Sequence, residues 1–289
     1  MRRLRRRSAR VRGTCSHGSE ITSVGVAASG RRLPGRVLVE PGAYRVGRDS
    51  FAIDEPGAYL FEDDGSMLEQ RIVPGAWLEG FLTDLSWLWG YGSADDSLSP
   101  RARLRRALHA RVSATCTPLS SDLASILCEA GFRARVVLIF TREELNDVDN
   151  GHTLLEIVSQ DGWAVYDPSF RTFFTRGAHR LSLLEWCNAI QEGEYEIEPL
   201  PGGAPHLGGF GPTSAALRER MEKLVASEDE RRRWYHRLAG APLVRTADGR
   251  FSFAADDPLA AVLSAYSSTY APLDPAEFRR LWSDAEPAA

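Results

Sequence analysis

Hydrophobic and polar positions divide the chain into a strand-rich beginning, a mixed middle and a mostly helical end. Apolar residues recur at helical spacing between Trp77 and Trp89, and Pro100 then opens a basic helix. The earlier segments are short and β-prone, with turn signals between or after them, at Val37–Val39, Tyr44–Val46, Ser50–Ile53 and Ala58–Phe61. We therefore expect several short strands, and then a buried helix, before Pro100.

A helix is predicted directly after Cys116. Thr117 is a suitable N-cap, Pro118 a suitable first helical residue, and Gly131 a suitable helix stop. Cys128 falls inside this helix, where we expect it to behave as a small hydrophobic residue. The apolar face of the helix consists of Leu119, Leu123, Ile126, Leu127 and Ala130.

A strand and a β-hairpin are predicted after this helix. The apolar run Ala134–Phe140 predicts the strand. The segments Leu154–Val158 and Trp163–Tyr166 are strand-like and are joined by a turn that ends in Asp-Gly. In this hairpin His152 begins one strand and Asp167 ends its partner, so the two residues should become neighbours at the open end.

The region after residue 212 is predicted to be mostly helical. Residues 199–212 contain four Pro and five Gly, which predicts a loop or linker before it. A small hairpin is expected around Asp248-Gly249, between helical segments. We therefore expect a basic disordered leader, a core with an N-terminal β/helical extension, a Pro/Gly-rich linker and a helical C-terminal region, at residues 1–36, 37–198, 199–212 and 213–289.

Charge is distributed unevenly along the chain, whose formal net charge is -4. The first 36 residues contain ten Arg and one acidic residue, whereas the rest contains 25 basic and 38 acidic residues. The acidic charge of the main body argues against a nucleic-acid-binding core. The leader lacks the apolar core of a secretory signal, and no run is apolar enough to span a membrane. We expect a cytoplasmic protein without a membrane partner, whose leader is dispensable.

The cysteines do not form a metal-binding or disulfide pattern. There are four of them, Cys15, Cys116, Cys128 and Cys187, and none belongs to a Cys-x-x-Cys pair. Cys15 and His17 supply only two ligands in the leader. We expect no metal and no cofactor, and a reducing compartment with one reactive thiol.

Three residues suggest nucleophilic catalysis. Cys116 lies at a helix N-terminus, where unpaired N–H groups and the helix dipole favour a thiolate. An imidazole such as that of His152 can hold a thiolate, and a carboxylate such as that of Asp167 can orient the imidazole. Taken singly, such residues are more often structural, but their joint occurrence in this secondary structure favours a nucleophile, a base and an orienting acid.

Roughly residues 100–175 resemble the transglutaminase-like superfamily. Members of that family have a Cys at a helix start, a Gly-x-x-Ala-Arg-Val segment after the helix, a His that opens the next strand and an Asp-Pro that closes the one after. The matching positions are Cys116, Gly131, Arg133-Ala134-Arg135-Val136, Gly151-His152, Glu156, Gly162-Trp163 and Tyr166-Asp167-Pro168. Ala114-Thr115 before the Cys and Thr153 after the His depart from the family pattern.

The resemblance implies a papain-like α+β core, in which a helix that carries the Cys packs on an antiparallel sheet that carries the His and the Asp. It also implies a catalytic triad, with Cys116 as nucleophile, His152 as general base and Asp167 as orienting acid. No segment resembles the calcium loops or the flanking β-sandwich domains of the animal enzymes.

The implied reaction is attack of a thiolate on an amide or ester carbonyl of a peptide, a protein or a small substrate, which gives a thioester acyl-enzyme. Water as acceptor makes a thiol peptidase or amidase, and an amine makes an acyltransferase. We rank the hydrolase slightly first. The alternative is a non-catalytic binding or scaffold module that retains the fold, although an intact triad argues against it.

Overall fold

The chain folds as an α+β protein. Its computed structural model describes residues 89–107, 112–129, 131–146, 148–159, 162–200 and 207–283, together with the strands between residues 37 and 72 and Leu78, Leu82 and Leu85. The predicted leader, 1–36, lies outside the described residues. Two compact units are present, Met1–Gly90 with Ser97–Val112 and Tyr91–Asp96 with Ser113–Ala289. Within the described residues, no helix combines the length and the apolar character needed to cross a bilayer.

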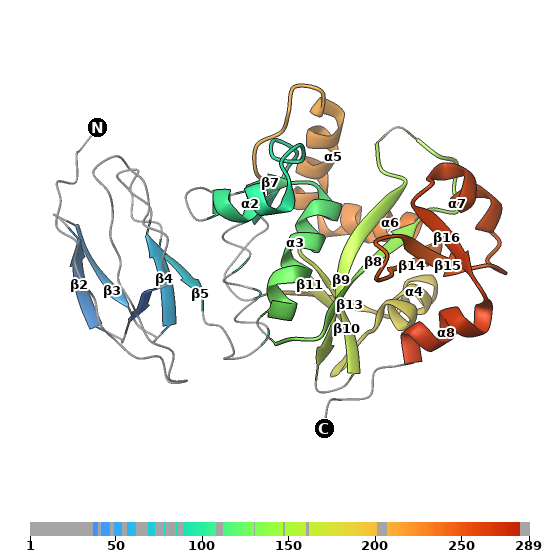
Figure 1. Ribbon diagram of the computed structural model, residues 1–289, viewed down its shortest axis with the longest axis horizontal. Helices are drawn as coiled ribbons and strands as arrows, with labels where there is room; N and C mark the ends of the chain where they lie inside the picture. Colours follow the sequence, from blue (N-terminus) through green and yellow to red (C-terminus); the bar gives the residue numbers. More distant parts are fainter. Residues whose placement is uncertain are drawn as a thin grey trace. The chain divides into compact units, whose positions relative to one another are not determined.

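Short strands begin the first unit, as the sequence pattern predicts (Figure 1). β1 pairs with β4 and β4 with β5, and β2 pairs with β3, all antiparallel. The strand β5 is not among the predicted ones, because its sequence Glu-Gln-Arg-Ile is mostly polar. The elements are β1 (Val37–Val39), β2 (Gly42–Val46), β3 (Asp49–Ile53), β4 (Gly57–Phe61), β5 (Glu69–Ile72) and the basic helix α2 (Pro100–Ala107).

The predicted buried helix ends before the end of its hydrophobic pattern. Leu78, Leu82 and Leu85 are helical, and the last two are buried. Trp89, by contrast, lies in strand β6 (Trp89–Tyr91). An apolar run can continue from a helix into a strand, so periodicity alone does not show where one element replaces the other.

A nine-stranded sheet forms the centre of the second unit (Figure 1). Its order is β12-β11-β10-β9-β8-β14-β15-β16, with β13 paired to β11, and only β15 and β16 are parallel. The strands are β8 (Ala134–Phe140), β9 (Gly151–Ser159), β10 (Gly162–Asp167), β11 (Thr172–Arg176), β12 (His179–Arg180), β13 (Glu196–Pro199), β14 (Ala241–Arg245), β15 (Phe251–Ala254) and β16 (Tyr270–Leu273). The strand β7 (Val112–Ala114) pairs with β6. The helices are α3 (Cys116–Glu129), α4 (Leu183–Glu192), α5 (Ala215–Ala226), α6 (Glu228–Leu238), α7 (Ala260–Tyr266) and α8 (Pro275–Ser283).

The helix α3 lies on one face of this sheet, and α4 and α6 lie on the other. Consecutive residues of a strand point to opposite faces. In β9, Thr153 bonds with Thr117 of α3, whereas Leu154 belongs to the core cluster that contains Trp186 of α4 and residues of α6. His152 therefore lies on the face that α6 covers.

The C-terminal third is not a separate region, which corrects the predicted division. β14 pairs with β8, and β15 and β16 extend the same sheet. The hairpin predicted around Asp248-Gly249 is confirmed, but Leu243, Val244 and Phe253 are buried and join it to the core. Strand pairing over such a distance is not visible in a local pattern.

The end of the predicted linker also packs against the core. The N–H of Gly208 donates to the carbonyl of Tyr91 at 2.7 Å. A Cβ on Gly208 would lie 2.2 Å from Oγ of Ser113, so glycine is needed there for close approach. Glycine at this position therefore allows the segment to pack closely against Ser113 of β7.

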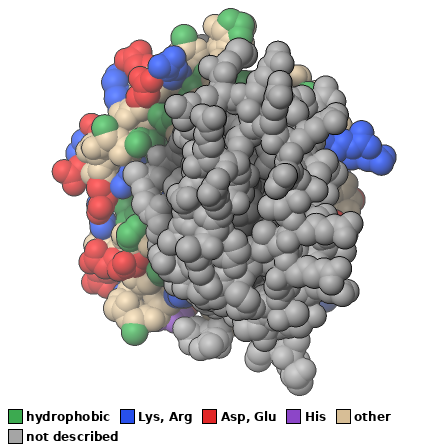
Figure 2. Space-filling model, turned by 90° about the vertical axis from the view of Figure 1, so that its left-hand side faces the viewer, with side chains coloured by type: hydrophobic (Ala, Val, Ile, Leu, Met, Phe, Trp, Pro, Cys, Tyr) green, Lys and Arg blue, Asp and Glu red, His purple; other side chains and the backbone are tan. Residues whose placement is uncertain are grey.

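Charges of both signs are mixed on the surface of the second unit. In Figure 2, acidic and basic side chains lie side by side along the described edge of one face. On α5 and α6, Arg218 pairs with Glu222, and Arg232 pairs with Glu228. Such exposed pairs contribute at most about 1 kcal/mol each.

Candidate active site

Cys116 is the first residue of α3, which begins earlier than predicted. The N–H of Leu119 donates to the carbonyl of Thr115 at 3.0 Å, so Thr115 rather than Thr117 precedes the helix. Thr117 is therefore not the N-cap, and its hydroxyl instead bonds with that of Thr153 at 2.7 Å. This contact fastens the start of α3 to β9, one residue after His152.

Two aspartates hold the chain immediately before the cysteine. The N–H of Ser113 donates to Asp95 at 2.8 Å, and the N–H and the hydroxyl of Thr115 both donate to Asp96 at 2.9 Å. Thr115 thus helps to fix the backbone directly before Cys116. Asp95 and Asp96 were not predicted from the sequence, because their partners lie about twenty residues further along the chain.

The predicted hairpin brings His152 and Asp167 together. Ser159 pairs with Gly162, and this register places the ends of β9 and β10 side by side. Nε2 of His152 lies 2.8 Å from Oδ2 of Asp167, and both side chains are buried. Because Nε2 is engaged by the carboxylate, Nδ1 is the ring nitrogen left for the thiol of Cys116.

The carboxylate of Asp167 receives three further hydrogen bonds. The N–H groups of Ser169 and Phe170 donate to Oδ1 at 2.8 and 3.3 Å, and the hydroxyl of Tyr235 donates to Oδ2 at 2.6 Å. Burial raises the pKa of Asp167, but the charge of His152 and these hydrogen bonds outweigh burial and lower it. The carboxylate is therefore held in its ionised form beside the imidazole.

The electrostatics of Cys116 and His152 favour an ion pair. Burial raises the pKa of Cys116, but hydrogen bonding to His152, the charge of His152 and the backbone of Thr153 together lower it. Burial lowers the pKa of His152, whereas Asp167 and Cys116 raise it to about 10. A thiolate beside an imidazolium is the reactive form of a cysteine nucleophile.

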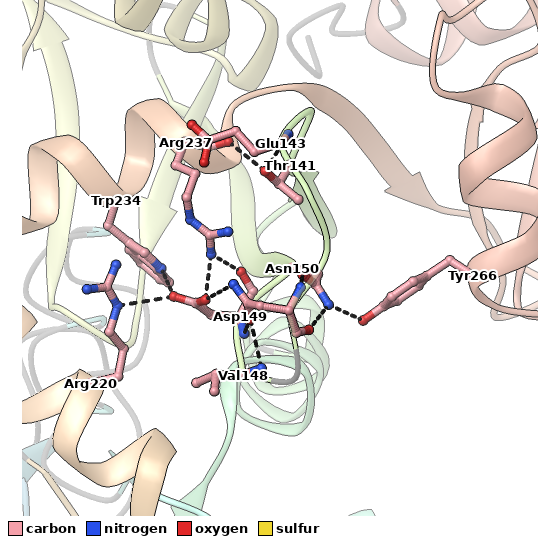
Figure 3. Close-up of polar contacts among 10 residues, drawn as sticks. Thr141, Glu143, Val148, Asp149, Asn150, Arg220, Trp234, Arg237 and Tyr266 are labelled. Atoms are coloured by element: carbon pink, nitrogen blue, oxygen red, sulfur yellow. Dashed lines mark hydrogen bonds and ion pairs between the residues drawn. The ribbon is translucent and has the colours of Figure 1, made fainter.

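The helix α6 places two consecutive aromatic residues against His152. The ring of Trp234 lies 4.7 Å from that of His152, centroid to centroid, and Tyr235 follows it. Figure 3 shows how Trp234 is held: its Nε1 donates to Oδ2 of Asp149 at 2.7 Å, and Arg220 and Arg237 bind the same carboxylate. Trp234, Arg220 and Arg237 were not predicted to reach the site because they belong to the C-terminal region, and their partner Asp149 lies in the polar loop before β9.

The other described cysteines differ from Cys116. Cys187 is buried, and burial raises its pKa to about 12. Cys128 lies within α3, as predicted, but it is exposed, so the expectation that it packs as a small hydrophobic residue is wrong. The described residues contain no cluster of three His, Cys, Asp or Glu side chains that could hold a metal ion.

Comparisons of the chain with protein-family models, with curated proteins and with solved structures find no match. The chemistry of the site is therefore inferred from its own residues. These are a half-buried thiol at a helix N-terminus, an imidazole and a buried carboxylate, held by two helices on opposite faces of one sheet.

Proposed function

We propose that the chain is a transglutaminase-like cysteine enzyme with a papain-like core, in which Cys116 is the nucleophile, His152 the general base and Asp167 the orienting acid. The observation that carries the proposal is the buried hydrogen bond of 2.8 Å between His152 and Asp167, next to a thiol whose pKa the imidazole lowers. The packing of α3 against β8 and β9 supports the papain-like arrangement.

The reaction begins with attack of the Cys116 thiolate on the carbonyl carbon of an amide or ester. A C–S bond forms, and the π electrons move to the oxygen. When the intermediate collapses, the C–N or C–O bond breaks, and the imidazolium of His152 gives its proton to the departing amine or alcohol. A thioester acyl-enzyme remains, and His152 is neutral.

The acceptor then resolves the thioester. His152 takes a proton from water or from an amine as that nucleophile attacks the carbonyl, and the thiolate of Cys116 leaves. Asp167 keeps Nε2–H of the neutral imidazole directed at itself, so that Nδ1 is the basic nitrogen. Water gives a thiol peptidase or amidase, which we rank slightly ahead of amine transfer.

The start of α3 supports stabilisation of the oxyanion. The first N–H groups of a helix have no partner within the helix, and at the N-terminus of α3 they belong to Cys116 and Thr117. Such N–H groups can donate to the oxygen on which negative charge develops. A reactive thiolate also needs a reducing compartment, so we propose a cytoplasmic location.

The direct test is incubation with a peptide library and added methylamine, scored by mass spectrometry for cleavage, deamidation or amine incorporation. We expect one of these products with the wild type and with Cys128→Ala, and none with Cys116→Ala. The two variants are matched, since each removes one thiol from α3. Products that persist in Cys116→Ala, or a wild type without products, would count against the proposal, and the second result would favour a non-catalytic binding module.

A further inference from the structure

Four large apolar residues are exposed in the described part of the chain, and they lie on two segments. Leu145 and Val148 are 42% and 40% exposed and belong to the loop that leads from β8 to β9. Val262 and Tyr266 are 39% and 45% exposed and lie four residues apart on α7, where such spacing places them on one face. Large apolar side chains that gather on a surface indicate a binding site more than isolated ones do.

The two segments meet beside the beginning of β9. Nδ2 of Asn150 donates to the hydroxyl of Tyr266 at 3.4 Å, and Figure 3 shows this bond reaching from the loop to α7. Asn150 lies two residues before His152. Phe140, which ends β8 and pairs with Gly151, contacts the ring of Tyr266 edge-on at 4.8 Å between centroids.

A second tyrosine connects this surface to Phe140, whose partner Gly151 directly precedes His152. The rings of Tyr266 and Tyr270 lie 5.9 Å apart, and Tyr270 also contacts Phe140 at 6.2 Å. Burial raises the pKa of Tyr270, and so do the charges of Tyr266 and Cys116. Tyr270 is half-buried and packs on Phe140 at the end of β8, and Tyr266 is the more exposed of the two tyrosines.

We propose that Tyr266 and Tyr270, together with Val262, Leu145 and Val148, form the acyl-donor recognition surface of Cys116. It takes a peptide segment with an aromatic or large aliphatic side chain next to the reactive carbonyl. Flat tyrosine rings offer large apolar area at a low conformational cost, and two separate segments can contact more of a peptide than of a small ester. The inference rests on the proposed function, because it supplies that reaction with a substrate class.

Two chloromethyl ketones with the same reactive group test the proposal, one derived from N-acetyl-phenylalanine and one from N-acetyl-glycine. In both, the cysteine sulfur forms a bond to the methylene carbon and chloride leaves, so no turnover is needed. Peptide mapping gives the rates at Cys116 and at the exposed Cys128 in the same sample. The preference at each cysteine is the ratio of the rate with the phenylalanine probe to the rate with the glycine probe. We expect the preference at Cys116, divided by the preference at Cys128, to be at least about tenfold.

Variants of the surface should change this preference. Tyr266→Ala should reduce the preference to less than about threefold, Val262→Ser should reduce it partly, and Tyr266→Phe should retain it, because the ring is what binds. Ser264→Ala, on the same helix, is the control and should leave it unchanged.

Iodoacetamide, which has no side chain to recognise, separates the two proposals. Suppose that iodoacetamide labels Cys116 rapidly. If the two chloromethyl ketones then react at equal rates after normalisation to Cys128, or if Tyr266→Ala keeps the full preference, the recognition surface is wrong and the catalytic site stands. If iodoacetamide labels Cys116 no faster than Cys128, the proposed function is wrong, and the surface loses its role with it.

Discussion

The hydroxyl of Tyr235 donates a hydrogen bond of 2.6 Å to Asp167, on the same oxygen that faces Nε2 of His152. A residue of the C-terminal third therefore helps to hold the orienting acid of the candidate triad. Burial raises the pKa of Tyr235 far above its usual value, and the charge of Asp167 raises it further, so the hydroxyl remains a donor.

Replacing Tyr235 by Phe should weaken the orientation of His152 without removing a triad member. The carboxylate loses one of its donors, so we expect the pKa of Asp167 to rise, the pKa of His152 to fall, and the Cys116 alkylation rate near neutral pH to drop about tenfold. Stability should fall by about 1–2 kcal/mol. Alkylation rates measured against pH, together with denaturant unfolding, check both effects.

Tyr166→Phe is the matched control for this variant. Tyr166 is also buried, precedes Asp167 in the chain, and its hydroxyl bonds with Arg180 at 2.7 Å instead of with Asp167. We expect a similar loss of stability and an unchanged pH profile. A profile that shifts equally in both variants would show that Tyr235 acts only through the general stability of the fold.

Asp167→Asn should reduce reactivity by about 10–10³-fold, because it removes the negative charge and can favour the wrong imidazole tautomer. The side chain is fully buried and receives several hydrogen bonds, so we expect a stability loss of about 1–3 kcal/mol. This is more than its position at the end of a strand alone would suggest. Thermal melts and alkylation pH profiles measure the two effects, and superimposable profiles would remove Asp167 from the triad.

The ion pair of His152 and Asp167 should give stability a defined pH dependence. The pKa of His152 is raised in the folded chain, so its contribution is complete below the unfolded value of about 6.5 and is lost as the pH rises through the raised value. The pKa of Asp167 is lowered, so its contribution is complete above about pH 4 and is lost as the pH falls through the lowered value. The pair therefore stabilises the fold most between about pH 4 and 6.5.

His152→Gln measures this contribution. Both chains should carry Cys116→Ala, so that the thiolate does not add its own titration. We expect the difference in unfolding free energy between the two chains to shrink steadily as the pH rises above about 6.5. A difference that stays constant over this range would contradict the ion pair.

Local patterns were sufficient for the part of the site that lies within one hairpin. The two apolar runs and the turn signal between them predict the hairpin, and its register, in which Ser159 pairs with Gly162, brings His152 to Asp167. The helix after Cys116 followed in the same way from its apolar face, although its first residue was misplaced by the cap assigned to Thr117.

Contacts over long sequence distances were not predictable from these patterns. Tyr235 lies 68 residues after Asp167, and Trp234 reaches Asp149 across 85 residues. Both contacts depend on how α6 packs against the sheet. The strand β14, which follows α6 in the chain, belongs to this sheet through its pairing with β8. Periodicity reports which face of an element is apolar, but not which other element covers that face.

The most direct test of the central claim is the rate of iodoacetamide alkylation at Cys116 and at Cys128 in one native sample between pH 5 and 9. Cys128 is the more accessible thiol, so access alone would favour it. Because His152 lowers the pKa of Cys116, we expect Cys116 to react at least about tenfold faster at pH 6–7, and to lose this advantage in His152→Ala. Equal rates at the two cysteines, or an advantage of Cys116 that survives His152→Ala, would contradict the account.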